Sequence, residues 1–187
     1  MSIVPEFEIG VWNAWILTLF IFLHALVLSL VFKEKEKPQE RIPQSQSEKK
    51  ADTFRTILLY LMFAYSVFLP LQTGTPWLYT GIGIYLLGIV LYTVVMANWY
   101  SSPEGKPVMK GIYQYSRHPQ YLIQKIMFVG VGIATASWLF LVILTIYMVF
   151  VNIQTNAEER FCLDKFSDSY RKYMKQTSKW FGISKSE

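Results

Sequence analysis

Four long, predominantly apolar runs divide the chain. Three of them, Ile9 to Val31, Phe54 to Leu71 and Trp77 to Met96, contain 23, 18 and 20 residues. A helix needs roughly 20 residues to cross the hydrocarbon of a bilayer. The fourth run, Leu122 to Val151, contains 30 residues but is broken near Ala134 to Ser137. We therefore predict a short helix, a turn and a returning helix there, which brings the number of membrane-spanning helices to five.

Polar segments separate these runs. Lys33 to Asp52 mixes charges of both signs with two prolines, which is typical of a solvated and flexible loop. Gln72 to Pro76 is short and contains glycine and proline, which predicts a tight turn and therefore an antiparallel pair of helices.

The segment after Val151 changes to an amphipathic pattern. Its apolar residues recur at steps of three and four, at Leu163, Phe166, Tyr170 and Tyr173, while basic residues occupy the other faces. A helix with this pattern fits the headgroup region of a membrane.

The composition agrees with a membrane protein. Of the 187 residues, 52% are hydrophobic and 17% aromatic, which is more apolar than an ordinary soluble domain of this size. We predict an all-α integral membrane protein with five transmembrane helices, the last two forming a helical hairpin, and a C-terminal amphipathic interfacial helix. We interpret residues 1–187 as one domain, with scaffold helices and loops in 1–107 and the functional half in 108–175.

The charges indicate an orientation. If five helices cross the bilayer, segments 32–53, 97–121 and 152–187 share one side, and all 18 Lys and Arg residues lie in these segments or next to them. Basic residues favour the cytoplasmic side, so we predict a multi-pass membrane protein with these segments in the cytoplasm. We attribute the net charge of +5 to basic residues that face the membrane surface and set the topology, and we therefore expect no nucleic-acid partner. The oligomeric state is left open.

Several isolated residues carry weaker signals. His24 and His118 are the only histidines, so we expect no metal site and interpret His24 as a packing or interfacial residue. Cys162 is the only cysteine, which excludes an intrachain disulfide; a small apolar position on a helix face is favoured over a nucleophile. Gly81 and Gly83 lack the third glycine of a dinucleotide fingerprint and instead favour close packing of membrane helices.

The segment Gly111 to Tyr121 concentrates polar chemistry between two apolar runs. Taken alone, Arg117 and His118 fit two interfacial side chains that reach lipid phosphates. Pro119 fits the first turn of a helix, where no amide hydrogen is needed. The loop would then lead directly into the fourth helix.

A pair of acids, Glu158 and Glu159, follows the last apolar run. Taken alone, the pair fits the first turn of a helix capped by Asn156. With five transmembrane helices, however, these acids lie on the same side of the membrane as the Arg117-His118 loop, so the two could meet.

Taken together, these elements form an ordered pattern. They are Gly111-x-Tyr113, Arg117-His118-Pro119-x-Tyr121, a helical hairpin of about thirty residues, Glu158-Glu159, Phe166 and Tyr170-x-x-Tyr173. This order resembles the isoprenylcysteine carboxyl methyltransferase superfamily of integral membrane enzymes, which includes phospholipid and small-thiol methyltransferases. The resemblance covers residues 108 to 174.

The resemblance implies a site for S-adenosylmethionine enclosed by the loop, the hairpin and the Glu pair, with a lipophilic acceptor entering from the bilayer. The implied cofactor-binding residues are Gly111, Tyr113, Arg117, His118, Pro119, Tyr121, Glu158 and Glu159. Carboxylates and aromatic faces suit a donor that carries a sulfonium cation and an amine.

Catalysis and acceptor binding involve fewer candidates. If the acceptor has to lose a proton, His118, Glu158 and Glu159 are the available bases near neutral pH. Three polar residues are candidate acceptor contacts: Gln124, Lys125 and Gln154. Polar groups at membrane depth are costly and therefore point to function, although a lysine near a helix end also snorkels to the surface.

The chain departs from the family pattern at several points. Leu122 to Gln124 replace a glycine that often follows the loop tyrosine, Phe166-Ser167 replaces a typical Phe-Gly, and Ser178 to Gly182 replace an Arg-x-x-Pro-type ending. A basic residue that carboxyl-methylating members have before the Glu pair is missing from Asn152 to Asn156. This disfavours a prenylcysteine carboxylate as acceptor and favours a thiol, an amine or a lipid headgroup.

Two other functions are open at this stage. Membrane reductases of the sterol-reductase type have a similar Arg-His-Pro-x-Tyr end and use NADPH, but they are longer than 187 residues. A non-enzymatic membrane adaptor could keep the scaffold without the activity. The cofactor that the purified protein binds would distinguish the three.

Overall fold

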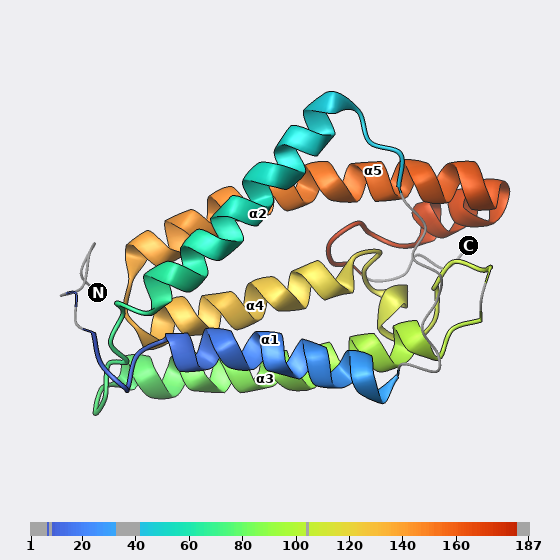
Figure 1. Ribbon diagram of the computed structural model, residues 1–187. Coiled ribbons are helices and arrows are strands. Elements are labelled where there is room, and N and C mark those ends of the chain that lie inside the picture. Colours follow the sequence, from blue (N-terminus) through green and yellow to red (C-terminus); the bar gives the residue numbers. More distant parts are fainter. Residues whose placement is uncertain (1–6, 8, 33–41, 104, 183–187) are drawn as a thin grey trace.

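The computed structural model describes residues 7, 9–32, 42–103 and 105–182. In this part of the chain it contains five α-helices and one short 3-10 helix. The helices are α1 (Trp15–Val31), α2 (Gln46–Ser66), α3 (Pro76–Tyr100), η2 (Gly111–Gln114), α4 (Pro119–Ala134) and α5 (Trp138–Gln176). Consecutive α-helices run in opposite directions, so the ends of α1, α3 and α5 gather at one end of the bundle (Figure 1). The predicted all-α class is confirmed.

Among the described residues, two helices, α3 and α5, are long and apolar enough to cross a membrane, and α1 is a shorter apolar helix. Large apolar side chains such as Leu23, Val90 and Val149 are 48%, 61% and 58% exposed. Lipid chains can cover such surfaces without the cost that water would impose. The 16 residues of α4 extend only about 24 Å, which is less than the bilayer core of about 30 Å.

The first two helices begin at other residues than predicted. The apolar run from Ile9 is not helical until Trp15, because Asn13 and its neighbours pair with the chain around Pro70. In contrast, α2 begins at Gln46, inside the predicted loop. Ser45 and Glu48 form a capping box, in which each side chain accepts the other's backbone N–H. The rest of that loop, residues 33–41, lies outside the described residues.

The predicted break in the fourth apolar run is confirmed. A turn at Thr135 to Ser137 joins α4 to α5, and Ser137 caps α5 by accepting the backbone N–H of Phe140. Pro119 begins α4, as expected from its missing amide hydrogen.

The helix boundary predicted near Asn156 is wrong. No glycine or proline interrupts Asn152 to Asn156, and α5 continues through this segment. The chain reverses later, at Ser167, which has φ 46° and ψ −118°. The last turns of α5 then fold back toward the loop before α4 (Figure 1).

Glycines allow α3 and α4 to lie in backbone contact. A Cβ on Gly81 would be only 2.6 Å from the carbonyl oxygen of Gly130, and a Cβ on Gly130 would be 2.7 Å from the backbone N of Tyr85. This is the small-residue packing that the sequence suggested. Because α3 and α4 form the most extensive helix contact, the scaffold half and the functional half are packed against each other.

Candidate functional site

A tight loop places the Arg-His-Pro motif at the start of α4. Gly111 begins η2 with φ 65°, where a Cβ would collide with the side chain of Asn98 on α3. Only glycine fits this position without strain. Tyr113, in the same short helix, is buried and its backbone carbonyl accepts a 2.6 Å hydrogen bond from the Tyr173 hydroxyl. The loop is thereby fixed against both α3 and the returned end of α5.

His118 lies between the two carboxylates of α5. Its Nε2 is 3.0 Å from Glu159 Oε1, and its Nδ1 is 3.5 Å from Glu158 Oε2. The imidazole is buried, with a side-chain exposure of 7%. Two segments separated by about forty residues therefore meet at this ring.

Arg117 ties the same carboxylate to the end of the chain. Its Nε donates to Glu159 Oε1 at 2.9 Å, and its Nη1 donates to the carbonyls of Met174 and Thr177 at 3.2 and 2.6 Å. The side chains of Arg117 and Glu159 are each 10% exposed. Glu159 is thus largely buried between the guanidinium and the imidazole.

Glu158 has a different environment. Its Oε1 accepts hydrogen bonds from the Tyr121 hydroxyl at 2.6 Å and from Gln154 Nε2 at 3.1 Å. Gln154 Nε2 also donates to the Tyr121 hydroxyl oxygen at 3.0 Å. The side chain of Glu158 is 21% exposed, twice as much as that of Glu159, so the two acids are not equivalent.

The charges around His118 favour its protonated form. Burial alone would lower the pKa of His118, but hydrogen bonds to Glu158 and Glu159 and their charges outweigh it, and the pKa is raised above 6.5. An imidazolium has a donor on each nitrogen, which matches a carboxylate oxygen beside each nitrogen. His118 is therefore arranged as a cation that holds two carboxylates.

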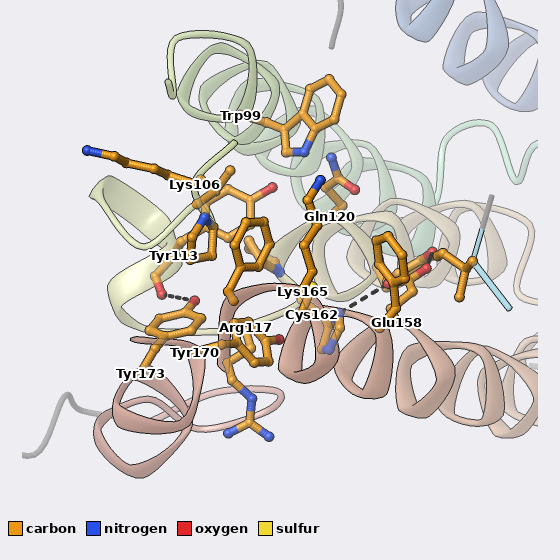
Figure 2. Close-up of a pocket in the computed structure, with 18 of the residues that line it drawn as sticks. Trp99, Lys106, Tyr113, Arg117, Gln120, Glu158, Cys162, Lys165, Tyr170 and Tyr173 are labelled. Atoms are coloured by element: carbon orange, nitrogen blue, oxygen red, sulfur yellow. Dashed lines mark hydrogen bonds and ion pairs between the residues drawn. The ribbon is translucent and has the colours of Figure 1, made fainter. Parts of the chain in front are cut away.

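A cavity of about 580 Å³ opens beside these residues (Figure 2). This is within the usual range of roughly 300–1,000 Å³ for small-molecule sites. Of the residues that the sequence singled out, the cavity is lined by Tyr113, Arg117, His118, Pro119, Tyr121 and Glu158. Glu159 does not line it.

The remaining candidates that the sequence singled out do not line the cavity. Gly111 shapes the loop without lining the cavity, and Lys125 is exposed. Gln124 accepts a hydrogen bond from the Tyr147 hydroxyl at 3.3 Å. Gln154 contacts Tyr121 and Glu158, while its own Oε1 is buried without a hydrogen-bond partner among the described residues.

One face of α5 supplies cavity residues to which the sequence analysis assigned no role in the site. They are Phe161, Cys162, Lys165 and Phe166. With Glu158 they recur at steps of three and four, the spacing of neighbours on one helix face. This periodicity is visible in the sequence and identifies them once Glu158 is assigned to the cavity. Cys162 therefore faces the cavity.

The aromatic face after residue 163 is also turned to the cavity. Tyr170 and Tyr173 are both 5% exposed and line it together with Phe166. The interpretation that this face lies on membrane headgroups is therefore wrong for these residues. The reversal at Ser167 explains the difference, because it directs the face back onto the loop.

The opposite wall of the cavity comes from the end of α3, the segment between α3 and η2, and the chain before α2. Trp99 lies across the cavity from Tyr170 and Tyr173 (Figure 2). The apolar lining on this side comes from Ile42, Met96, Trp99, Tyr100, Pro107 and Val108. The cavity thus has a polar, hydrogen-bonding side at α4 and α5, where Glu158 lies beside Arg117, His118 and Lys165, and an apolar side at α3.

The residues present suit an aromatic ligand that carries charges of both signs. Glu158 offers a carboxylate, Arg117 and Lys165 offer positive charge, and several phenol rings and the indole of Trp99 offer faces that attract cations. Within the described residues, no cluster of three or more His, Cys, Asp or Glu could hold a metal ion.

Comparison with known families gives one result for this chain. The family model described as phospholipid methyltransferase matches residues 74–169, slightly more than half of the sequence. The matched region contains α3, the Arg117-His118 loop, α4 and α5 as far as the reversal. No curated protein matches the chain.

Proposed function

Because the chain belongs to the phospholipid methyltransferase family, we propose that it methylates a phospholipid headgroup in the cavity between α3, α4 and α5. Family members use S-adenosylmethionine as methyl donor, and the chain is accordingly an S-adenosylmethionine-dependent membrane methyltransferase. This family assignment replaces the reductase and adaptor alternatives. The observation that carries the proposal is that His118, Tyr121 and Glu158 line one cavity of sufficient size.

The donor is assigned to the polar side of the cavity, beside Glu158. When bound, S-adenosylmethionine supplies an activated methyl group on a sulfonium cation. Glu158 would hold its ribose hydroxyls or amino group, and Tyr113 and Tyr121 would offer ring faces to its positive charge. Arg117, His118 and Glu159 would keep Glu158 in place. Gly111 and Pro119 serve the same site through the backbone, by shaping the loop and beginning α4.

The acid–base role falls to Glu158 in preference to His118. Both imidazole nitrogens face carboxylates, so His118 is poorly placed to accept a proton. Glu159 is engaged by two cations. Glu158 is the carboxylate that lines the cavity, and it would take the proton that an amine acceptor releases. Most of the rate enhancement is expected from holding the reactants in line and excluding water.

The acceptor is assigned to the apolar side. Met96, Trp99 and Val108 offer an apolar wall for the glycerol and acyl parts of a phospholipid. Gln124, Lys125 and Gln154 are kept as weaker candidates for acceptor contacts, since none of them lines the cavity. Gln154 has the best support of the three, because its amide nitrogen donates to Glu158 and its buried Oε1 has no hydrogen-bond partner among the described residues.

The test uses purified protein in lipid nanodiscs and a methyl-labelled donor. Label is expected in phosphatidylethanolamine and not in added thiols or fatty carboxylates. Glu158→Gln and His118→Ala are each expected to weaken binding of S-adenosylhomocysteine about tenfold or more, the effect of losing a charge-assisted contact. Binding of NADPH without S-adenosylhomocysteine would overturn the proposal, as would unchanged affinity in both variants.

Acceptor binding is tested separately from donor binding. Trp99→Ala is expected to raise KM for phosphatidylethanolamine about tenfold while the Kd for S-adenosylhomocysteine changes less than twofold. If Trp99→Ala lowers only donor affinity, the apolar side belongs to the donor and the acceptor assignment fails.

We also propose that all five helices lie in the membrane, where α4, which is shorter than the hydrocarbon core, is packed against α3, and that the cavity faces the cytoplasm. The support is that Lys106, Arg117 and Lys165, among the described basic residues, lie at the cavity, at the end of the bundle where α3 and α5 end. In a Cys162→Ser background, Thr73→Cys is expected to react with a membrane-impermeant maleimide from outside intact cells, and Lys110→Cys only after lysis. The opposite labelling pattern would reverse the orientation.

A further inference from the structure

We infer that the segment Thr177–Gly182, here named the C-terminal strap, positions His118 for methyl transfer, with Lys179 and Trp180 as its positioning residues. This inference rests on the proposed function. The strap follows the reversal at Ser167 and the last turns of α5, and it lies along the loop that carries Arg117 and His118.

Hydrogen bonds join the strap to the loop along its length. The backbone N–H of Arg117 donates to the carbonyl of Ser178 at 3.0 Å, and that of Gly182 donates to the carbonyl of Tyr115 at 3.0 Å. These bonds fix the backbone on either side of Ser116.

A further contact leads from the strap to His118 itself. The Ser116 hydroxyl donates to the carbonyl of Lys179 at 3.2 Å and accepts the backbone N–H of His118 at 3.1 Å. The strap therefore fixes the backbone at His118 through one intermediate side chain.

The side chain of Lys179 attaches the strap to α5. Its Nζ donates to Asn152 Oδ1 at 2.8 Å and to Asn156 Oδ1 at 2.5 Å. Asn152 and Asn156 are one helical turn apart, and Asn156 lies just before Glu158 and Glu159. Lys179 thus connects the loop to the part of α5 that carries both carboxylates.

Trp180 contributes one of two aromatic rings beside His118. The ring centroids of Trp180 and His118 are 6.1 Å apart, and those of Tyr121 and His118 are 6.2 Å apart. Trp180 also packs against the main hydrophobic core. The two rings are tilted by 50° to each other, and their packing limits movement of the imidazole. Lys179 Nζ lies 5.5 Å from the centroid of the Trp180 ring, a cation–π contact within the strap itself.

Through these contacts Lys179 and Trp180, which lie outside the cavity, hold His118 at a fixed distance from Glu158 and Glu159. Neither Lys179 nor Trp180 lines the cavity, so both act through other residues. Loosening the strap should let His118 and Glu158 move apart, which lowers donor affinity and turnover while the helices stay packed.

The experiment compares four variants of the full chain in nanodiscs. Lys179→Met and Trp180→Leu remove the two contacts, Lys179→Arg keeps a cation that can reach the asparagines, and Lys175→Met removes an exposed lysine from the last turn of α5 as a matched control. Measurements are Kd for S-adenosylhomocysteine, kcat with labelled donor, and hydrogen–deuterium exchange of residues 113–118 against residues 81–95.

Lys179→Met is expected to lower kcat about tenfold and to speed hydrogen–deuterium exchange in residues 113–118 but not in residues 81–95. Lys179→Arg should keep kcat and exchange close to the wild-type values. Lys175→Met should change neither. Trp180→Leu should act in the same direction. The inference is overturned if Lys179→Met leaves exchange in 113–118 unchanged, or if exchange rises equally in both segments, which would indicate general destabilisation. A folded wild type that neither binds S-adenosylhomocysteine nor transfers the labelled methyl group would refute the proposed function. The strap would still be tested in that case, because hydrogen–deuterium exchange does not depend on activity.

Discussion

The His118 imidazole and the Glu159 carboxylate are in contact, with 3.0 Å between Nε2 and Oε1, although 41 residues separate them in the sequence. The same carboxylate oxygen accepts Arg117 Nε at 2.9 Å. Glu158, the adjacent residue, instead accepts the hydroxyl of Tyr121 and lines the cavity. Two neighbouring acids therefore have separate tasks: Glu159 stabilises the loop, and Glu158 is available to ligands.

Glu159→Gln is expected to lower the free energy of unfolding by about 3 kcal/mol. The substitution leaves two largely buried cations, Arg117 and His118, without their shared carboxylate, and a charge that loses its buried partner is strongly destabilising. Denaturant unfolding in detergent, followed by tryptophan fluorescence, measures the change.

Glu158→Gln is the matched control. The amide oxygen can still accept the Tyr121 hydroxyl, and the side chain is more exposed, so unfolding should change by less than about 1 kcal/mol while donor binding weakens. Equal losses of stability in the two variants would contradict the division of tasks.

The pH dependence of stability should report on His118. Its pKa is raised above 6.5 in the folded protein, so its protonation contributes stability that is fully present below pH 6.5 and is lost as pH rises through the folded-state pKa. The unfolding free energy of the wild type minus that of His118→Gln, measured across neutral pH, should therefore decrease as pH rises. A difference that increases with pH would mean that the imidazole is neutral in the folded site.

Gly81→Ala should destabilise the bundle by about 1–3 kcal/mol, the usual cost of overpacking. Its Cβ would meet the backbone of α4 at Ala134 and Gly130, which cannot move without separating α3 from α4. Gly83→Ala, in the same helix, is the control: nothing lies within 4 Å of its Cβ, so the better helix propensity of alanine should make it neutral or stabilising. Thermal unfolding of both variants in one detergent provides the comparison, and equal Tm values would refute the close approach.

Ser167→Gly should stabilise the protein by about 1 kcal/mol. Ser167 has φ 46° and ψ −118°, a conformation that glycine adopts readily and other residues adopt only with strain. Arg171→Gly, in the regular helix after the reversal, should instead cost about 0.5–1 kcal/mol. If both glycines destabilise equally, the reversal at Ser167 is absent in solution.

The sequence predicted the parts of the fold that depend on local patterns. Apolar runs located the helices, the 134–137 break located the α4–α5 turn, and Pro119 marked the start of α4, because each effect acts within a few residues. The order of motifs also led us to expect that the Arg117-His118 loop would approach the Glu pair, and the structure brings them together.

The course of the chain after residue 151 could not be predicted in the same way. Asn156 and Glu159 match the pattern of a helix cap. In the structure α5 continues through both residues, and Glu159 instead contacts Arg117 and His118, which lie about forty residues away in the sequence. The only local hint of the reversal was Ser167 in place of a glycine. The contacts of the C-terminal strap join residues about sixty positions apart, and no local pattern encodes such pairing.

Because the Arg117 loop depends on residues 174–182, the parts of the protein should fold in a fixed order during synthesis. The helices up to the apolar half of α5 can enter the membrane while translation proceeds, but the guanidinium of Arg117 lacks two of its carbonyl partners until Met174 and Thr177 have left the ribosome. The proposed methylation centre is then the last part of the protein to mature. A nonsense mutation near codon 170 should yield a chain that is inserted yet inactive, a substrate for membrane quality control.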